Sequence, residues 1–187
     1  MRKFLAASLT LLVVLVAANC TESANGSDAE AATDPEPAQS TAHYLQASSS
    51  VTQCPGTEPT LVEMDITDAA NGVAMAANQL TVSEAGAYLI VAAPQVGREG
   101  GGPYGCFDLW LRVNGTDVGN SNVQLCQDEG SMAKDVIISQ GIVPLEAGDV
   151  IEVMMSASNP DANMCIEAIQ PEGEPLVPAI IFSMIRY

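Results

Sequence analysis

Basic, imidazole and aromatic side chains are scarce in this sequence. Six Lys and Arg stand against 23 Asp and Glu, which gives a net charge of −17 over 187 residues, and there is a single His. So few cations cannot neutralise the phosphates of a nucleic acid or hold the chain on an anionic membrane surface. One His and two Lys also leave few groups for acid–base catalysis near neutral pH. We therefore expect neither a nucleic-acid partner nor an enzyme.

Motifs of metal, nucleotide and hydrolytic sites are also missing. No two Cys have the CxxC spacing of zinc and redox sites, and no acidic residues have EF-hand spacing. The glycines at 100–102 are followed by Pro103 and no Lys, unlike a phosphate-binding loop. The acidic residues are scattered through predicted turns, so no carboxylate pair is placed for glycoside hydrolysis. We expect no metal, no cofactor and no catalytic residue.

The N-terminal segment is typical of a secretory signal peptide. Arg2 and Lys3 precede an apolar stretch over residues 4–18. That stretch is short for a membrane span, which needs about 20 apolar residues. A retained anchor helix is the alternative. The segment predicts export from the cytoplasm.

The end of this segment resembles the bacterial lipobox, in which a Cys after small residues is lipidated and becomes the new N-terminus. The sequence there is Val-Ala-Ala-Asn-Cys, ending at Cys20. This predicts a signal peptide over residues 1–19 and a lipid on Cys20. Asn19 stands where Gly, Ala or Ser is usual, and cleavage after Ala18 by ordinary signal peptidase is the alternative. We expect a membrane-anchored lipoprotein or a secreted protein.

The cysteine count agrees with this interpretation. Five Cys is an odd number, which in a secreted chain requires an explanation. If Cys20 carries lipid, four Cys remain for two disulfides in an oxidising compartment. The alternative is a free or intermolecular thiol at Cys20. Four Cys allow three pairings, which the sequence alone leaves open.

Composition changes at about residue 44. Residues 20–43 contain acidic residues, no Lys or Arg and no large apolar side chain before Tyr44. Such a segment cannot bury enough surface to fold, so we expect a disordered acidic tether with His43 as a solvated residue at its end. A leader without a role is the alternative. Residues 44–187 are expected to form one folded domain.

This domain has the pattern of an all-β sandwich or barrel. Short β-branched runs alternate with Gly, Pro, Asn and Asp, and Asn114-Gly115 is a strong hairpin signal. A turn is expected at residues 68–72. The predicted strands cover residues 61–66, 79–82, 87–96, 106–113, 116–125, 135–143, 150–156, 165–169 and 179–187.

Four segments together resemble the complement C1q and tumour necrosis factor superfamily: LTVSEAGAYLIVAAPQV, FDLWLRVNG, VPLEAGDVIEVMMSAS and AIIFSMIRY. The resemblance covers roughly residues 60–187, and it implies an antiparallel two-sheet jelly-roll sandwich that forms trimers. No collagen-like run precedes the domain, and the last strand lacks the Phe-Ser-Gly of complement heads. The family's ligands do not carry over. The matching residues are Val82, Gly86, Tyr88, Asn114, Gly115, Leu145, Gly148 and Asp149.

Strand faces predict where the trimer contact lies. In strand 106–113 one face is apolar and Trp110 lies on the other. In strand 150–156 Met154 likewise lies on the face opposite Ile151, Val153 and Met155. The last strand is apolar on both faces. The resemblance implies that these three strands share the inner sheet of a trimer. We expect a homotrimer buried around Trp110, Met154 and one face of the last strand, namely Ile180, Phe182 and Met184. Burial of Trp110 under a loop such as 97–105 is the alternative.

The resemblance also bears on the disulfides. The family topology places Cys126 at the end of one strand and Cys165 at the start of its neighbour. This favours Cys126–Cys165 with Cys54–Cys106. The pairing of nearer neighbours, Cys106–Cys126 with Cys54–Cys165, stays open.

Two functions remain. The first is a surface-displayed, non-enzymatic binding module that recognises a protein or a glycan through loops 97–105, 127–134 and 158–164. The chain has only one Trp, four Tyr and three Phe, so few aromatic side chains are available to stack against a sugar ring. The second is a structural or assembly protein whose trimer is itself the function. Exposed aromatic or polar clusters on these loops favour the first.

Overall fold

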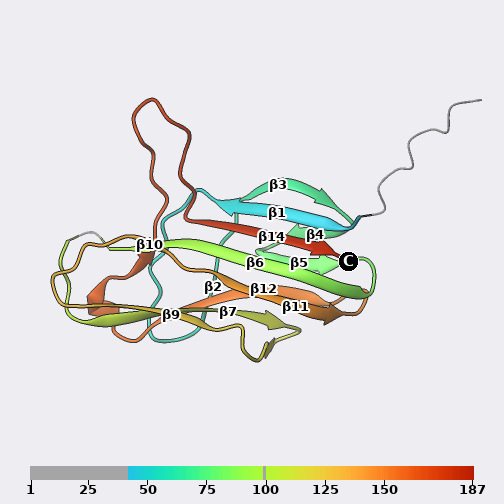
Figure 1. Ribbon diagram of the computed structural model, residues 1–187, viewed down its shortest axis with the longest axis horizontal. Coiled ribbons are helices and arrows are strands. Elements are labelled where there is room, and N and C mark those ends of the chain that lie inside the picture. Colours follow the sequence, from blue (N-terminus) through green and yellow to red (C-terminus); the bar gives the residue numbers. More distant parts are fainter. Residues whose placement is uncertain (1–41, 99) are drawn as a thin grey trace, which may run out of the picture. The chain divides into compact units, whose positions relative to one another are not determined.

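Two antiparallel β-sheets face each other in the computed structural model, which describes residues 42–98 and 100–187 (Figure 1). The predicted signal peptide, Cys20 and the tether up to residue 41 lie outside the described residues. Neighbouring strands in both sheets come from distant parts of the chain, as in a jelly roll. The predicted fold class, an all-β jelly-roll sandwich, is confirmed.

The first sheet, called here the β14 sheet, runs in the order β10-β6-β14-β1-β3, and β11 and β13 also pair with β6. Its strands are β1 (Tyr44–Ser49), β3 (Ile66–Asn71), β6 (Gly86–Gly97), β10 (Asp135–Val136), β11 (Ser139–Leu145), β13 (Cys165–Ile166) and β14 (Ile180–Arg186).

The second sheet, the β7 sheet, runs in the order β4-β5-β12-β7-β8, with β2 on β12 and β9 on β7. Its strands are β2 (Thr60–Leu61), β4 (Val73–Ala76), β5 (Gln79–Val82), β7 (Gly105–Val113), β8 (Thr116–Asp117), β9 (Val123–Gln127) and β12 (Val150–Ala157).

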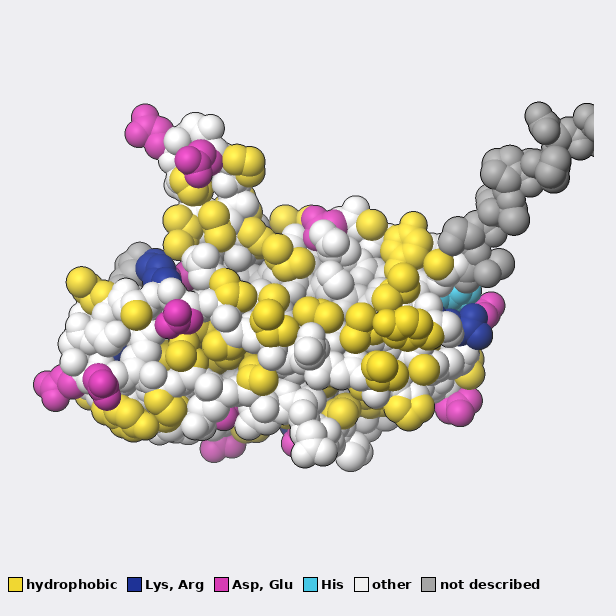
Figure 2. Space-filling view, viewed as in Figure 1, with side chains coloured by type: hydrophobic (Ala, Val, Ile, Leu, Met, Phe, Trp, Pro, Cys, Tyr) yellow, Lys and Arg dark blue, Asp and Glu magenta, His cyan; other side chains and the backbone are white. Residues whose placement is uncertain are grey.

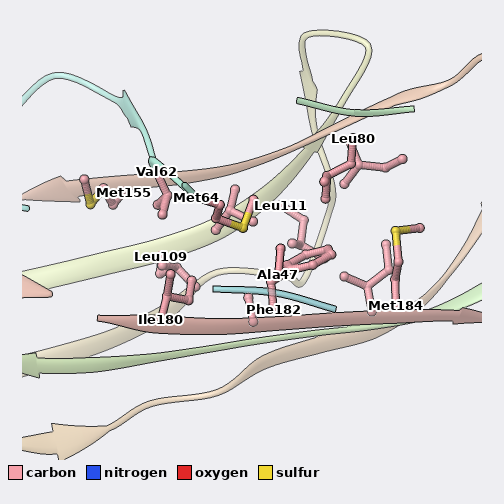
Figure 3. Packing of buried hydrophobic residues seen from close by; sticks show 14 of the residues in the cluster. Ala47, Val62, Met64, Leu80, Leu109, Leu111, Met155, Ile180, Phe182 and Met184 are labelled. Carbon is pink, nitrogen blue, oxygen red and sulfur yellow. The ribbon is translucent and has the colours of Figure 1, made fainter. Parts of the chain in front are cut away.

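The core lies between the sheets because alternate residues of each long strand point inward. Phe182 and Met184 of β14 enter the same cluster as Leu109 and Leu111 of β7, and all four are buried (Figure 3). Full burial of one such side chain contributes about 1.5–3 kcal/mol. Tyr88 is fully buried, and its hydroxyl donates to the Glu84 carbonyl at 2.8 Å. Burial raises the pKa of the Tyr88 hydroxyl.

Several strands differ in extent from their predictions. The predicted strand 116–125 is divided into β8 and β9, because residues 118–122 leave the sheet. Strand 135–143 is likewise divided into β10 and β11. The predicted turn at 68–72 falls mostly in β3, whereas β1 and β4 were not predicted. The Asn114-Gly115 hairpin is confirmed, since both residues have positive φ, at 49° and 77°.

The last strand occupies a different sheet from the one the family resemblance implied. β7 and β12 are neighbours, but β14 lies in the opposite sheet between β6 and β1. Ile180, Phe182 and Met184 therefore point into the core, with exposed fractions of at most 2%. Their prediction as trimer-interface residues is wrong. Both faces of this strand are apolar, so its sequence did not reveal which face turns inward.

The disulfides are Cys54–Cys165 and Cys106–Cys126, the pairing of nearer neighbours. The pairing favoured at first, Cys126–Cys165 with Cys54–Cys106, is wrong. Cys106 and Cys126 lie directly opposite each other on β7 and β9. The bridge between Gln53 and Ile166 brings Cys54 beside Cys165 in the same way. Two disulfides indicate an oxidising environment.

Candidate functional site

The outward face of the β14 sheet carries exposed apolar side chains on four neighbouring strands. Pairing places Ile142 of β11 beside Leu89 of β6, Leu89 beside Ile185 of β14, and Ile185 beside Tyr44 of β1. Together with Ile181 these side chains form what is called here the β14 face. The exposed members are Ile142 at 66%, Ile181 at 44%, Ile185 at 43% and Tyr44 at 38%.

The β14 face is uncharged. The outward-facing positions of β1, β6, β11 and β14 hold no Asp, Glu, Lys or Arg, although the net charge of the chain is −17. Figure 2 shows hydrophobic side chains gathered along the middle of this view, with most acidic side chains near its rim. Contiguous exposed apolar patches are the kind of surface at which proteins often bind a partner.

Sequence reasoning missed this face because it assigned the apolar positions of the last strand to the wrong side. A usable signal existed in β6, where Leu89 and Val91 alternate with Tyr88 and Ile90, so that both faces are apolar. A strand that is apolar on both faces is covered on both faces. The core covers one face of β6, and the described residues leave the other partly exposed.

The loops named as binding elements, 97–105, 127–134 and 158–164, meet around Arg98. This side chain is 1% exposed. Its guanidinium donates to the carbonyls of Ser131 at 2.6 Å, Pro103 at 2.8 Å, Ala162 at 3.3 Å and Asp128. A planar guanidinium suits this role because it offers five donors in a fixed geometry. Arg98 thus holds three loops, distant in sequence, in one arrangement.

Exposed side chains on these loops include an aromatic residue and several acids. Tyr104 is 56% exposed and Met132 is 64% exposed. Asp128, Glu129 and Asp161 are also exposed. The disulfide of Cys106 adjoins this region, since the Tyr104 hydroxyl lies 3.3 Å from Cys106 Sγ. The loops therefore present a mixed aromatic and acidic surface on a backbone held by Arg98.

Trp110 and Met154 are neighbours on the outward face of the β7 sheet. Met154 is 5% exposed and Trp110 is half-buried. The indole N–H donates to Asp117 Oδ1 at 2.8 Å, so Trp110 adjoins segment 117–122 rather than loop 97–105. These two residues lie on a different sheet from the β14 face. A single interface of the kind predicted cannot contain them together with β14.

His43 is not the solvated linker residue that was predicted. Its imidazole packs over Gly72, where a Cβ would lie 2.3 Å from His43 Nδ1. Nδ1 lies 3.3 Å from Ser83 Oγ, and Nε2 lies 3.5 Å from Glu84 Oε1. The Ser83 hydroxyl donates to the Gly72 carbonyl at 2.8 Å, so its proton is not directed to the imidazole, as a nucleophile requires. Arg186 donates to Glu84 at 2.7 Å, so this group joins the residue just before β1 to the end of the last strand.

Asp149 is confirmed as a turn residue that binds local backbone. Its carboxylate accepts from the Glu146 N–H at 2.8 Å and from the Asn114 amide at 2.7 Å. These two hydrogen bonds hold the pKa of the Asp149 carboxyl below its usual range, and the bond from the Glu146 N–H has the larger effect. These bonds join the hairpin after β7 to the start of β12.

Neither a metal centre nor a membrane span emerges from residues 42–98 and 100–187. No His, Cys, Asp and Glu side chains gather there in a group of three or more that could hold an ion. In the same residues no helix has the length and apolarity needed to cross a bilayer.

Comparison with known proteins finds a likeness in solved structures but none in sequence. No protein-family model matches the chain, and no curated protein matches its sequence. A crystal structure of murine APRIL at pH 5.0 is similar, with a TM-score of 0.48 and 14% identity, over 78% of this chain and 99% of that one. APRIL is a member of the tumour necrosis factor family. The likeness concerns the chain path, and the jelly-roll assignment rests on the strand order and pairing described above.

Proposed function

We propose that this chain is a non-enzymatic, extracytoplasmic binding module that acts as a homotrimer and is displayed from a lipid on Cys20. Its ligand, a protein or a glycan, is recognised by the loops around Arg98. The observation that carries the proposal is the uncharged, partly exposed β14 face. The family resemblance in the sequence supplies the expectation of three copies.

The charge distribution supports a second copy of the chain as the occupant of the β14 face. Copies with a net charge of −17 repel each other unless their contact surfaces are free of charge. The β14 face meets this condition over four strands, and closed symmetry buries such a face equally in every copy. This interface replaces the one predicted around Ile180, Phe182 and Met184.

The loops favour a binding module over a purely structural trimer. A protein whose trimer is itself the function has no need for an exposed Tyr104 and Met132 on loops that a buried guanidinium holds in place. In a trimer the loops are present three times, so weak single sites gain avidity. The structural or assembly protein remains the second candidate function.

Light scattering on residues 40–187, which contain both sheets and both disulfides, tests the trimer. We expect three times the monomer mass. Ile185→Asp places a charge in the middle of the β14 face and is expected to give a monomer, because burying an unpaired carboxylate is unfavourable. Met132→Asp makes the same kind of change on an exposed apolar side chain of the loops, and is expected to leave the mass unchanged.

A monomer at high concentration for the unaltered protein contradicts the trimer. A trimer that survives Ile185→Asp places the contact elsewhere. The lipid is tested separately by expressing the full chain in a bacterium with and without Cys20→Ser. We expect the unaltered chain to partition into detergent and the variant to remain in the aqueous phase, and equal partitioning contradicts lipidation.

A further inference from the structure

A shallow hollow opens on the outward face of the β7 sheet beside Trp110. It has a volume of about 340 Å³, near the lower end of small-molecule sites, which run to roughly 300–1,000 Å³. Aromatic, carboxylate, amide and hydroxyl groups converge there. They belong to Trp110, Asp108, Asp117, Asn120, Asn122 and Ser156. We propose that this hollow binds a neutral pyranose sugar.

The hollow exists because the sheet is interrupted at Trp110. β7 pairs with β9 up to Leu109 and with β8 from Arg112 onward, and residues 118–122 leave the sheet between the two. Ser121 takes the place of a strand partner, since its Oγ accepts the Leu111 N–H at 3.0 Å. Ser121 is 4% exposed, and its carbonyl accepts from Ser139 Oγ at 2.6 Å. The wall of the hollow is thus fixed before any ligand arrives.

Trp110 is held in one orientation. Its indole N–H donates to Asp117 Oδ1 at 2.8 Å, and the same oxygen accepts from Arg112 Nε at 2.7 Å. The ring is half-buried, and its remaining surface faces the hollow. An indole offers a flat apolar surface to the C–H groups of a sugar ring. Trp110 can therefore act as a preset platform.

The polar groups match hydroxyls, which both donate and accept. Asp108 accepts from the Asn122 amide at 3.2 Å and from the Gln124 amide at 3.1 Å, and a carboxylate has room for further donors. The amide of Asn120 and the hydroxyl of Ser156 add groups that donate and accept.

The charged residues at the hollow favour a neutral sugar over an anionic one. The residues that line the hollow include no Lys or Arg, and the guanidinium of the adjoining Arg112 is paired with Asp117. No free positive group faces an anionic sugar, and the uncompensated Asp108 carboxylate repels one. The Asn122 and Gln124 amides already donate to the Asp108 carboxylate. Its remaining acceptor positions therefore favour hydrogen bonds from sugar hydroxyls over an ion pair with a cation. The site lies on the opposite sheet from the β14 face, so it does not depend on trimerisation or on the loops.

Trp110 is the only Trp in the chain, so fluorescence excited selectively at the indole, without the four Tyr, reports on this hollow. Residues 40–187 are titrated with the methyl pyranosides of glucose, galactose, mannose and N-acetylglucosamine, and with an array of neutral oligosaccharides. Tetramethylammonium and glucuronate serve as a cationic and an anionic probe. We expect a saturable change with at least one neutral sugar, in the millimolar range for a monosaccharide. The same affinity is expected for the Ile185→Asp monomer, which separates this proposal from the trimer.

Asp108→Asn keeps the shape of the side chain and removes its charge. We expect this variant to bind the sugar about tenfold more weakly or worse, which is the effect of losing one hydrogen bond to a charged group. Asp68→Asn, at an exposed position of β3 in the other sheet, is the matched control and is expected to change nothing. No saturable response to any neutral sugar overturns the proposal. So does an affinity unaffected by Asp108→Asn, or saturation by tetramethylammonium alone.

Discussion

Replacement of Arg98 by Met tests how the three loops are held. Met keeps an unbranched apolar stem, although it is shorter than Arg, and it lacks all five donors. Four carbonyl oxygens then lose their partner, and the bond to Ala162 is the one that is buried at both ends. The three loops otherwise share few bonds, such as that from the Gly130 N–H to the Gly102 carbonyl at 3.0 Å. The variant therefore separates the contribution of the guanidinium from that of the loop backbone.

The magnitude follows from these bonds. Leaving the buried Ala162 carbonyl unpaired costs about 1–3 kcal/mol. Water can replace the guanidinium at the three part-buried carbonyls, which lowers their cost to roughly 0.5–1 kcal/mol each. The free energy of unfolding is therefore expected to fall by about 2.5–6 kcal/mol, a large share of the roughly 5–15 kcal/mol of a typical domain. Arg98→Lys is expected to recover only part of this loss, because one ammonium cannot span four carbonyls.

Urea unfolding of residues 40–187 with both disulfides intact measures the loss. Amide hydrogen exchange over residues 127–134 and 158–164 shows whether the loops open before the sheets. Arg112→Met is the matched control, because Arg112 makes a surface ion pair with Asp117 that is worth about 1 kcal/mol or less. A loss for Arg98→Met no larger than that of the control, with unchanged exchange in the loops, would refute the reasoning.

Two further predictions concern the disulfides and acid stability. The Cys54–Cys165 disulfide spans 111 residues and Cys106–Cys126 spans 20, so replacing the first pair by Ser is expected to destabilise the domain by about 1.5 kcal/mol more, measured by urea unfolding. An equal loss contradicts this chain-entropy argument. Because folding lowers the pKa of Asp149 from 3.8, its contribution is present above that value and is lost as the pH falls through the lower pKa of the folded state. Asp149→Asn is expected to flatten the fall in stability below pH 4, and an unchanged slope would remove Asp149 as a cause.

Local sequence patterns predicted much of the fold. Alternation over residues 79–82, 87–96, 106–113 and 150–156 gave strands close to β5, β6, β7 and β12, because one buried face imposes a period of two. The Asn114-Gly115 hairpin followed from the positive φ that both residues tolerate. The prediction of one continuous strand over residues 116–125 was wrong, because the Ser121 side chain takes the place of a strand partner between β8 and β9. Local strand propensity does not show where a side-chain hydroxyl, rather than a neighbouring strand, will accept a backbone N–H.

The candidate site was predicted only in part. The three loops could be named from their Gly, Pro and Asn residues, but nothing local indicated that they meet around Arg98. Arg98 follows a strand and precedes a Gly-rich loop, which is an ordinary place for a solvated cation. Its burial depends on four carbonyls, three of which are supplied by residues 30 or more positions further along the chain.

By itself the sequence determined an all-β domain and a strongly acidic composition, because these follow from short-range periodicity and residue counts. The jelly-roll class was implied by the family resemblance, and two disulfides by the four Cys that remain if Cys20 carries lipid. Only the tertiary structure decided which face of β14 enters the core, which Cys are partners, and that His43 belongs to the domain. Each of these depends on contacts between distant segments. A strand with two apolar faces satisfies either orientation locally, so the opposite sheet makes the choice.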